Sequence, residues 1–384
     1  MRSEQRLTSW LQEYDEQDQV PEHLHGTFMT LLNNAGFSVY RSSLWLPTRH
    51  PELWGTQLIW SHNEGVKAYR RDHGITQTST YLNTPGERMH QARKPLRWQL
   101  AKGEGLEMSL LQEIADEGGN DYLIVPFHTD HKFEQPWITF ATKQPDGFTN
   151  DEIDSLISYC MPLSWKARVA MADMATRSLL QVYLGANAAD HVLQGEFQRG
   201  TGTRMDAVIW FCDMRGFTSL GDRCSSEELV AILDDYFEVM SAPIESGGGE
   251  ILKFIGDAIL AVFPLESEIK TVATKAIDAA QTALAKLSTW REQQTGYRKS
   301  ISAGIALHMG SVLYGNIGGS SRLDFTVIGA AVNEASRIES LCKTLAPLLV
   351  TEPVALAAQQ SMKSLGQFEL RGVEESIALF TPQN

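Results

Sequence analysis

The chain lacks the features that mark disulfide-bonded, membrane-spanning or secreted proteins. Its four cysteines are scattered without CxxC spacing, which argues against a disulfide framework or a zinc site and suits a reducing compartment. No stretch approaches the roughly 20 apolar residues that a membrane helix needs. No apolar segment follows the first residues as it would in a signal peptide. We therefore expect a cytoplasmic protein without membrane insertion.

Basic residues are in the minority. The chain has 33 Lys and Arg against 47 Asp and Glu, a net charge of −14. Nucleic acid and anionic membranes both require a basic surface, so neither is expected as a partner. A polyphosphate ligand is not excluded, because it needs only a locally positive site. With 384 residues and 43% hydrophobic content, the chain is long enough for two or three domains.

The composition changes near residue 200. Seven of the nine tryptophans lie in the first 165 residues, and eight of the ten histidines precede residue 132. We expect a regulatory domain at 1–165, a helical linker at 166–203 and a second domain at 204–384. The apolar patterns of the first two regions predict a helix, four strands and two further helices, at 7–14, 43–46, 55–60, 121–127, 137–142, 150–161 and 165–184. Pro162 should interrupt the helix that starts near 150, and Gly185 should end or kink the helix at 165–184.

The second domain alternates strands and helices. A capping box at Ser225–Glu228 starts its first helix, and a tight hairpin turn is expected at Gly256-Asp257. The remaining predicted elements are strands at 207–212, 302–308 and 312–317 and helices at 269–287 and 332–341. This βαββαβ order predicts an α+β fold, with a sheet that has helices packed on one face.

Two aspartates, Asp213 and Asp257, each end an apolar run that is typical of a strand. A carboxylate among hydrophobic residues must be paired, and two carboxylates brought together repel each other unless a cation lies between them. Divalent metals with oxygen ligands meet this need, and Mg²⁺ commonly brings phosphate groups with it. Taken singly, each aspartate is equally well explained as a turn residue at a strand end.

Four further residues carry chemistry only in combination. Lys253 lies inside an apolar run, where it either meets a partner or extends its amine to the sheet edge. Asn333 and Arg337 share one helix face and suit sugar and phosphate oxygens, although a surface pair with Glu334 is the simpler reading. Thr326 lies in a strand that favours β-branched residues in any case.

The glycine-rich segment GSVLYGNIGG at 310–319 lacks the GK[ST] ending of a phosphate-binding P-loop. We expect it to form a hairpin. The backbone amides of Phe217 and Thr218, directly after Asp213 and before a helix, are better placed to hold phosphate.

Three segments together resemble the signature of the class III nucleotidyl cyclase catalytic domain. They are FCDMRGFT at 211–218, KFIGD at 253–257 and VNEASR at 332–337, in that order. The resemblance covers residues 204–384, nearly half of the chain, and implies a ferredoxin-like βαββαβ fold. The order and spacing of the three segments are far more specific than any one of them.

The resemblance also implies roles for individual residues. Two Mg²⁺ or Mn²⁺ ions per active site would be held at Asp213, Asp257 and Met214, and Phe217 and Thr218 would belong to the substrate site. Asn333 would orient the ribose and Arg337 would stabilise charge on the phosphoryl group in an in-line displacement. Arg371 falls where the family has a triphosphate-binding residue, and Arg322 is a second candidate.

In this family the site forms between two head-to-tail subunits, so the resemblance implies a homodimer. The metal aspartates would come from one subunit, and Lys253, Thr326, Asn333 and Arg337 from the other. A lysine donor and a threonine oxygen suit the edge of adenine, whereas guanine needs an acidic partner where Lys253 stands. The expected reaction converts ATP to 3′,5′-cyclic AMP and pyrophosphate. Many family members have Asp where this chain has Thr326, which leaves one base contact neutral.

The first 165 residues resemble a GAF-type sensory domain in element order and in their position ahead of a cyclase. We expect them to bind an unknown small-molecule regulator. The pairs His23/His25 and His128/His131 are better explained as surface or hydrogen-bonded histidines than as metal ligands. Two rival functions are a cyclase-like module that binds nucleotide without turnover, and a diguanylate cyclase, although the chain has GGE at 248–250 and not the full GGDEF signature.

Overall fold

The structure is a computed structural model that describes residues 2–78, 80–127 and 135–383. The chain divides into two compact units, the first ending at Val182 and the second beginning at Tyr183. The predicted pair His128/His131 lies outside the described residues. No helix in the described ranges has the length and apolar character needed to cross a bilayer.

The N-terminal unit is built on a six-stranded antiparallel sheet with the strand order β3-β2-β1-β6-β5-β4. Its strands are β1 (Val39–Pro47), β2 (Leu53–Ser61), β3 (Gly65–Asp72), β4 (Leu96–Trp98), β5 (Asp121–Pro126) and β6 (Trp137–Thr142). Its α-helices are α1 (Arg2–Gln12), α2 (Pro21–Asn34), α3 (Pro85–Ala92), α4 (Ser109–Asp116) and α5 (Asn150–Leu184), with short 3₁₀ turns at Glu16–Gln19, His73–Gln77 and Leu100–Lys102.

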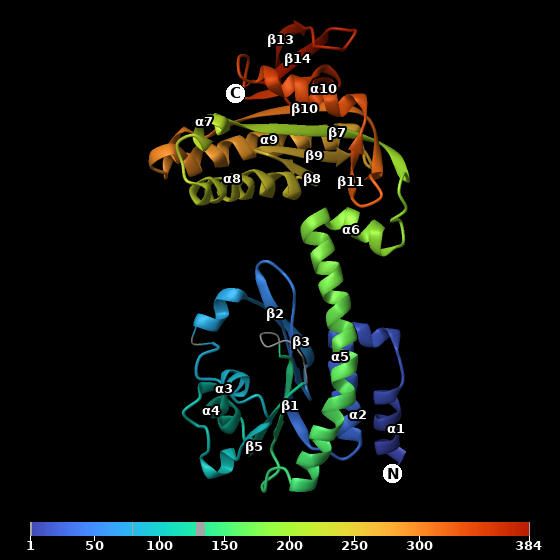
Figure 1. Cartoon of the computed structure of the whole chain (residues 1–384), viewed down its shortest axis with the longest axis vertical. Helices are drawn as coiled ribbons and strands as arrows, with labels where there is room; N and C mark the ends of the chain where they lie inside the picture. Colours follow the sequence, from blue (N-terminus) through green and yellow to red (C-terminus); the bar gives the residue numbers. More distant parts are fainter. Residues whose placement is uncertain (1, 79, 128–134, 384) are drawn as a thin grey trace. The chain divides into compact units, whose positions relative to one another are not determined.

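The two faces of this sheet bury different clusters. Side chains of α1, α2 and α5 form one core with alternate residues of the strands, such as Leu44 and Leu58. A smaller cluster on the other face joins α3 and α4 to β5, through residues such as Met89, Leu111 and Ile124. Figure 1 shows α3 and α4 on the opposite side of β1 and β5 from α2 and α5. The period-two alternation of strand side chains produces this two-sided burial.

The prediction that Pro162 interrupts a helix is wrong, because α5 runs unbroken from Asn150 to Leu184. Proline removes one backbone hydrogen bond, which disfavours but does not forbid a helix. An apolar stripe continues across it and packs into the core of the unit, and this packing outweighs the local cost. The stripe consists of Leu156, Cys160, Leu163, Ala167 and Ala170. Gly185, with a φ of 88°, ends the helix as predicted.

The C-terminal unit is built on an eight-stranded sheet with the order β13-β14-β12-β10-β7-β9-β8, and β11 pairs with β10. Its strands are β7 (Gly202–Arg215), β8 (Glu250–Ile255), β9 (Ala258–Pro264), β10 (Ser302–Gly318), β11 (Leu323–Ile328), β12 (Leu348–Thr351), β13 (Met362–Phe368) and β14 (Ile377–Pro382). Its helices are α6 (Ala186–Leu193), α7 (Phe217–Gly221), α8 (Ser226–Ser246), α9 (Ile269–Glu292), α10 (Ala330–Leu341) and α11 (Glu352–Ala357), with a 3₁₀ turn at Gly296–Ser300.

Helices cover both faces of this sheet, not one as the sequence pattern suggested. Trp210 of β7 is buried with residues of α8 and α9 on one face. Its neighbour Ile209 is buried on the other face with Ala188 of α6 and Ala335 of α10. The central strands are apolar on both sides because each side meets a helix layer. Figure 1 shows α8 and α9 on one side of β7 and α10 on the other.

The two strands expected at 302–308 and 312–317 are a single strand, β10. Gly310 does not form a turn there. It pairs with Ala207 of β7, and a Cβ atom on it would lie 2.5 Å from the Cβ of Ala331 in α10. Glycine is needed at this position because the helix approaches the strand closely. The hairpin turn comes later, between β10 and β11.

Candidate active site

Asp213 and Asp257 lie together at one end of the sheet. Asp213 is opposite Ala258 in the β7–β9 ladder, and Asp257 directly precedes Ala258 in the β8–β9 turn. Gly256 supports this two-residue turn with a φ of 65°. Burial and the nearby Asp213 carboxylate raise the pKa of Asp257 to about 6. Two carboxylates that oppose each other's ionisation in this way form an oxygen-rich site for a cation.

Arg215 and Glu339 flank this pair, and the sequence patterns did not single out either residue. The Arg215 guanidinium places Nη1 3.9 Å from Asp213 Oδ2 and Nη2 2.5 Å from Glu339 Oε1. Burial raises the pKa of the Glu339 carboxyl to about 7, although Arg215 acts in the opposite direction. Arg215 follows Asp213 by two residues in the same strand, and this spacing is the feature of the sequence that could have identified it.

Lys253 has a partner in the structure. Its Nζ donates a hydrogen bond of 2.9 Å to Asp324 Oδ2, and this bond lowers the pKa of Asp324. The register of the β8–β9 pair shifts between Ile251 and Lys253. The Lys253 side chain extends from this irregularity to Asp324 on β11. Asp324 and Thr326 are two residues apart on β11 and therefore share a face. Sequence reasoning noted Thr326 but missed Asp324, because only the tertiary packing of the sheet brings β11, which pairs with β10, into contact with β8.

Asn333 and Arg337 lie one turn apart on α10, with Asn333 exposed and Arg337 half-buried. Glu334 does not form the ion pair with Arg337 that the simpler reading offered, because its Oε2 lies 3.0 Å from Nε2 of His308. A Cβ atom on Gly372 would lie 3.6 Å from Nη1 of Arg337. The turn that carries the neighbouring Arg371 is therefore next to Arg337.

The remaining predicted positions surround the aspartate pair or lie away from it. Phe217 and Thr218 begin the short helix α7, two peptide units beyond β7. The side chain of Met214 is buried in the core, so only its backbone carbonyl is available to a metal. The charge of Arg322 contributes to the lowered pKa of Asp324, which places Arg322 near the Lys253 pair.

The geometry of this unit agrees with comparisons to known proteins. The family described as adenylate and guanylate cyclase catalytic domain matches residues 202–381. An adenylate cyclase of Anabaena cylindrica is 39% identical over 181 residues, which are 46% of this chain and 35% of the relative. Residues 202–381 are a class III nucleotidyl cyclase catalytic domain.

Two further relatives show how far the similarity extends. The terminal-differentiation-specific adenylate cyclase of Dictyostelium discoideum is 31% identical over 193 residues, or 50% of this chain and 8% of the relative. The chain thus spans about a third of the Anabaena relative and less than a tenth of this one. A bacterial light-regulated adenylyl cyclase structure has the same fold with a TM-score of 0.51, at 20% identity over 71% of this chain and 90% of that one.

The cyclase domain divides its candidate residues into separate groups. Asp213 lies with Asp257, Lys253 lies with Asp324, and Arg337 lies beside the turn of Arg371. Within the described part of the chain, no hydrogen bond or ion pair joins the aspartate pair to the group of Lys253 or to that of Arg337.

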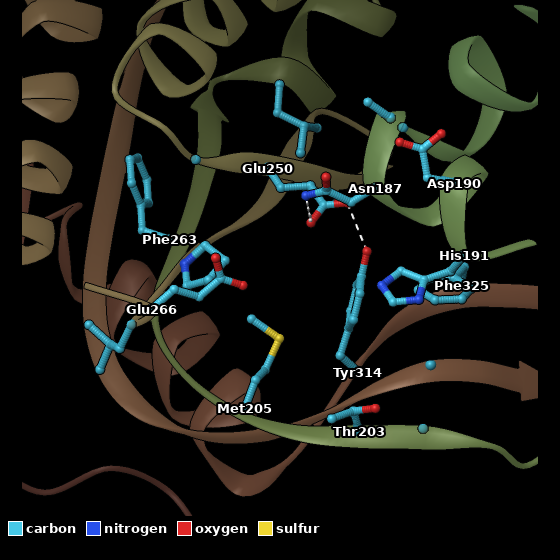
Figure 2. Close-up of a pocket in the computed structure, with 18 of the residues that line it drawn as sticks. Asn187, Asp190, His191, Thr203, Met205, Glu250, Phe263, Glu266, Tyr314 and Phe325 are labelled. Carbon is cyan, nitrogen blue, oxygen red and sulfur yellow. Dashed lines mark hydrogen bonds between the residues drawn. The ribbon is translucent and has the colours of Figure 1, made fainter. Parts of the chain in front are cut away.

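A cavity of about 1600 Å³ opens at the opposite end of β7 from Asp213. None of the sequence-predicted site residues lines it. Figure 2 shows Glu250 at its centre, where Asn187 Nδ2 and Tyr314 Oη donate hydrogen bonds of 3.0 Å and 2.8 Å to the Glu250 carboxylate. His191 stacks on Phe325 with ring centroids 5.7 Å apart. These contacts hold α6 on the cyclase domain.

Proposed function

We propose that the cyclase domain converts ATP to 3′,5′-cyclic AMP and pyrophosphate, as a homodimer controlled by the N-terminal unit. The single observation that carries the proposal is the Asp213–Asp257 carboxylate pair. The family description covers both adenylate and guanylate cyclases, so the choice of ATP rests on the residues around Lys253.

The donor set fits two Mg²⁺ or Mn²⁺ ions. Asp213 and Asp257 supply hard oxygen ligands. The raised pKa of Asp257 reflects burial and a repulsion from Asp213, and a divalent cation would relieve the repulsion. The backbone carbonyl of Met214 is the third candidate ligand. The bound ions would supply activation of the ribose 3′-hydroxyl and neutralisation of the triphosphate charge.

The protein groups would position ATP for the in-line displacement. Asn333 orients the ribose, and Arg337 stabilises the negative charge that develops on the α-phosphoryl group. The turn that carries Arg371 lies next to Arg337, so Arg371 would hold the triphosphate with it. The backbone amides of Phe217 and Thr218 bind phosphate oxygens beside Asp213. Pyrophosphate leaves as the 3′-oxygen bonds to the α-phosphorus.

Base selection would depend on Lys253 and its neighbours. The Lys253 ammonium donates to N1 of adenine, and the hydroxyl oxygen of Thr326 accepts from the 6-amino group. The guanine edge presents a donor at N1, which would leave Lys253 facing another donor in a partly desolvated site. Asp324 holds the lysine in place before the base arrives.

A second subunit would complete the site. The aspartate pair and the Lys253 group are separate within one chain, as expected if each serves a different active site. Apolar side chains are exposed beside these groups, with Phe254 49%, Ile255 47% and Ile328 50% exposed. Such residues at the ends of β8 and β11 are suited to cover one another in a dimer.

One experiment separates the proposed function from its rivals. The purified chain is incubated with Mn²⁺ and either ATP or GTP, and the products are separated by chromatography. We expect cyclic AMP from ATP and at most a small fraction as much cyclic GMP from GTP. Cyclic di-GMP would indicate a diguanylate cyclase, and bound nucleotide without any product would indicate an inactive module.

The same assay tests the aspartate pair. Asp257→Asn should lower the rate to the background level, because the amide cannot neutralise a divalent cation. The matched control is Asp222→Asn, an exposed acid at the end of α7, which should retain the rate of the unmodified protein. An active Asp257→Asn protein would contradict the assignment.

A further inference from the structure

The N-terminal sheet leaves part of one face uncovered by its helices. On the face that carries α3 and α4, the apolar cluster covers β4, β5 and part of β6. Beyond this cluster, towards β1, β2 and β3, the side chains enclose a cavity of about 100 Å³. This volume is smaller than the cavity of about 150 Å³ that accepts benzene. The cavity is open on one side, so it takes in part of a single ring and the rest of an occupant lies at its opening.

Aromatic rings form the walls of the cavity. The strand registers place Trp45 of β1 beside Gln57 of β2 on one side and Trp137 of β6 on the other. The Trp45 ring lies 4.6 Å from Trp54 and is stacked against Trp137 at 6.4 Å between centroids. Tyr81 meets Trp54 edge-on at 5.2 Å. Flat apolar walls of this kind favour a planar guest.

The polar lining is positive. Among the described residues, two arginines and no carboxylate line the cavity, although acidic residues outnumber basic ones in the chain as a whole. Arg41 is neutralised, because its Nη1 lies 2.8 Å from Glu113 and 3.2 Å from Glu117. Arg71 has no acidic partner among the described residues. Its Nε and Nη2 donate only to the neutral Oε1 of Gln57, at 3.2 Å and 2.9 Å.

Hydrogen-bond donors are in excess around the cavity. Gln57 is fully engaged, since it accepts from Arg71 and its Nε2 donates to Ser43 Oγ at 3.1 Å. The indole Nε1 of Trp137 is buried and has no acceptor in the described part of the chain. A buried donor without an acceptor is costly, so a guest that carries only acceptors would be stabilised here.

We propose that this cavity binds a small planar aromatic carboxylate, with the edge of its ring against Trp45 and Trp54 and its carboxylate on Arg71. A guanidinium forms paired hydrogen bonds with a carboxylate, and the ring would replace water against Trp45 and Trp54. The inference gives a chemical class to the regulator in the proposed function, and it rests on that proposal only for the regulatory consequence.

Binding is measured on the full chain without nucleotide, with benzoate as the probe and tryptophan fluorescence and calorimetry as readouts. Benzamide, which has the same ring but no charge, is the control ligand. We expect saturable binding of benzoate and at least tenfold weaker binding of benzamide, because the ion pair is lost. Equal affinity for the two ligands, or no saturable binding of benzoate, would overturn the proposal.

Two variants locate the binding site. Arg71→Gln should weaken benzoate binding at least tenfold, whereas Arg70→Gln, on the opposite face of β3, should leave it unchanged. Gln57→Glu supplies an internal carboxylate to Arg71 and should abolish binding in a folded protein, which circular dichroism verifies. Undiminished benzoate binding in both Arg71→Gln and Gln57→Glu would place the site elsewhere.

The regulatory consequence is tested separately by cyclase assays with and without benzoate. Binding that follows Arg71 supports the site whether or not the protein makes cyclic AMP. A failure of the proposed enzyme activity is therefore distinguished from a failure of this inference.

Discussion

Asp324 restricts the conformation of Lys253, the residue that would contact the base. A lysine in a strand has many rotamers, and the Asp324 carboxylate reduces them to those that keep Nζ near β11. Both side chains are partly exposed, at 32% for Lys253 and 45% for Asp324, so the pair is a modest ion pair that a base can open. In the proposed reaction, Asp324 would therefore position Lys253.

Asp324→Ala should raise KM for ATP by roughly two- to fivefold and leave kcat nearly unchanged, as expected for the loss of an exposed pair. The preference for ATP over GTP should fall in the same proportion. Steady-state assays with both nucleotides measure this, with Asp222→Ala as the control. A variant with unchanged KM and unchanged preference would show that the ion pair plays no part in binding.

His25 makes the N-terminal unit sensitive to acid. Its ring is buried, Nε2 shares a hydrogen bond of 2.9 Å with Ser42 Oγ, and Nδ1 has no partner among the described residues. Burial lowers the pKa of His25 from 6.5 to about 3. Its burial in the core excludes the paired metal role with His23, which instead lies near Asp15 and Asp18.

The free energy of unfolding should therefore fall as the pH drops below about 6.5. In that range the unfolded chain binds a proton at His25 that the folded chain does not, so acid favours unfolding until the pH nears 3. At pH 5 the expected loss is about 2 kcal/mol relative to pH 7. Chemical denaturation followed by tryptophan fluorescence measures it, because seven of the nine tryptophans lie in residues 1–165.

His25→Gln should reduce this pH dependence, whereas the exposed His73→Gln should preserve it. If His25→Gln showed the same slope between pH 7 and pH 5 as the unmodified protein, another group would have to account for the acid sensitivity.

At the scale of elements, one carboxylate supplies the polar link between α6 and the sheet of the cyclase domain, beside the apolar contacts of Ala188. Asn187 of α6 and Tyr314 of β10 both donate to Glu250 of β8, so this residue joins three elements. The link lies at the start of β7, and the aspartate pair lies at its other end. A displacement of α6 would therefore act on the same strand that carries Asp213.

Glu250→Ala should loosen α6 without unfolding the cyclase domain. Amide hydrogen exchange in 186–193 should become roughly tenfold faster, because the hydrogen bond from Asn187 to a charged group is lost. Exchange in 207–212 should stay the same. Glu266→Ala removes another acid of the same cavity that has no such bonds, and it should leave α6 protected (Figure 2). Equal protection of α6 in both variants would contradict this role for Glu250.

Local patterns predicted most of these elements well. The apolar stripe and capping box of α8 lie where the sequence placed them, and the box uses Ser225 and Glu228. Trp137–Thr142 is a strand with the predicted bounds. The failures at Pro162 and Gly310 share one cause. Each residue breaks regular structure by its own propensity, and each is overruled by packing against residues that are distant in the sequence.

At the scale of the whole molecule, the proposed dimer has a clear signature. Asp257→Asn and Arg337→Ala should each be inactive alone. In a mixture, half of the dimers would combine one subunit of each kind and restore one of their two sites. About a quarter of the original activity should therefore return. The assay is cyclic AMP formation after the two proteins are mixed and equilibrated. No recovery, with subunit exchange shown by a mass-tagged partner, would argue against shared sites.

The sequence by itself identified the cyclase domain, because the order and spacing of three short segments can be recognised without the fold. It also determined the approach of Asp213 and Asp257, since each follows a strand and the turn at Gly256 leaves little freedom. Only the tertiary structure decided that Asp324 holds Lys253, that Arg215 bridges Asp213 and Glu339, and that Arg71 faces an aromatic cavity without an acid. These contacts depend on strand order and register, which arise from the packing of the whole sheet and not from the spacing of neighbouring residues.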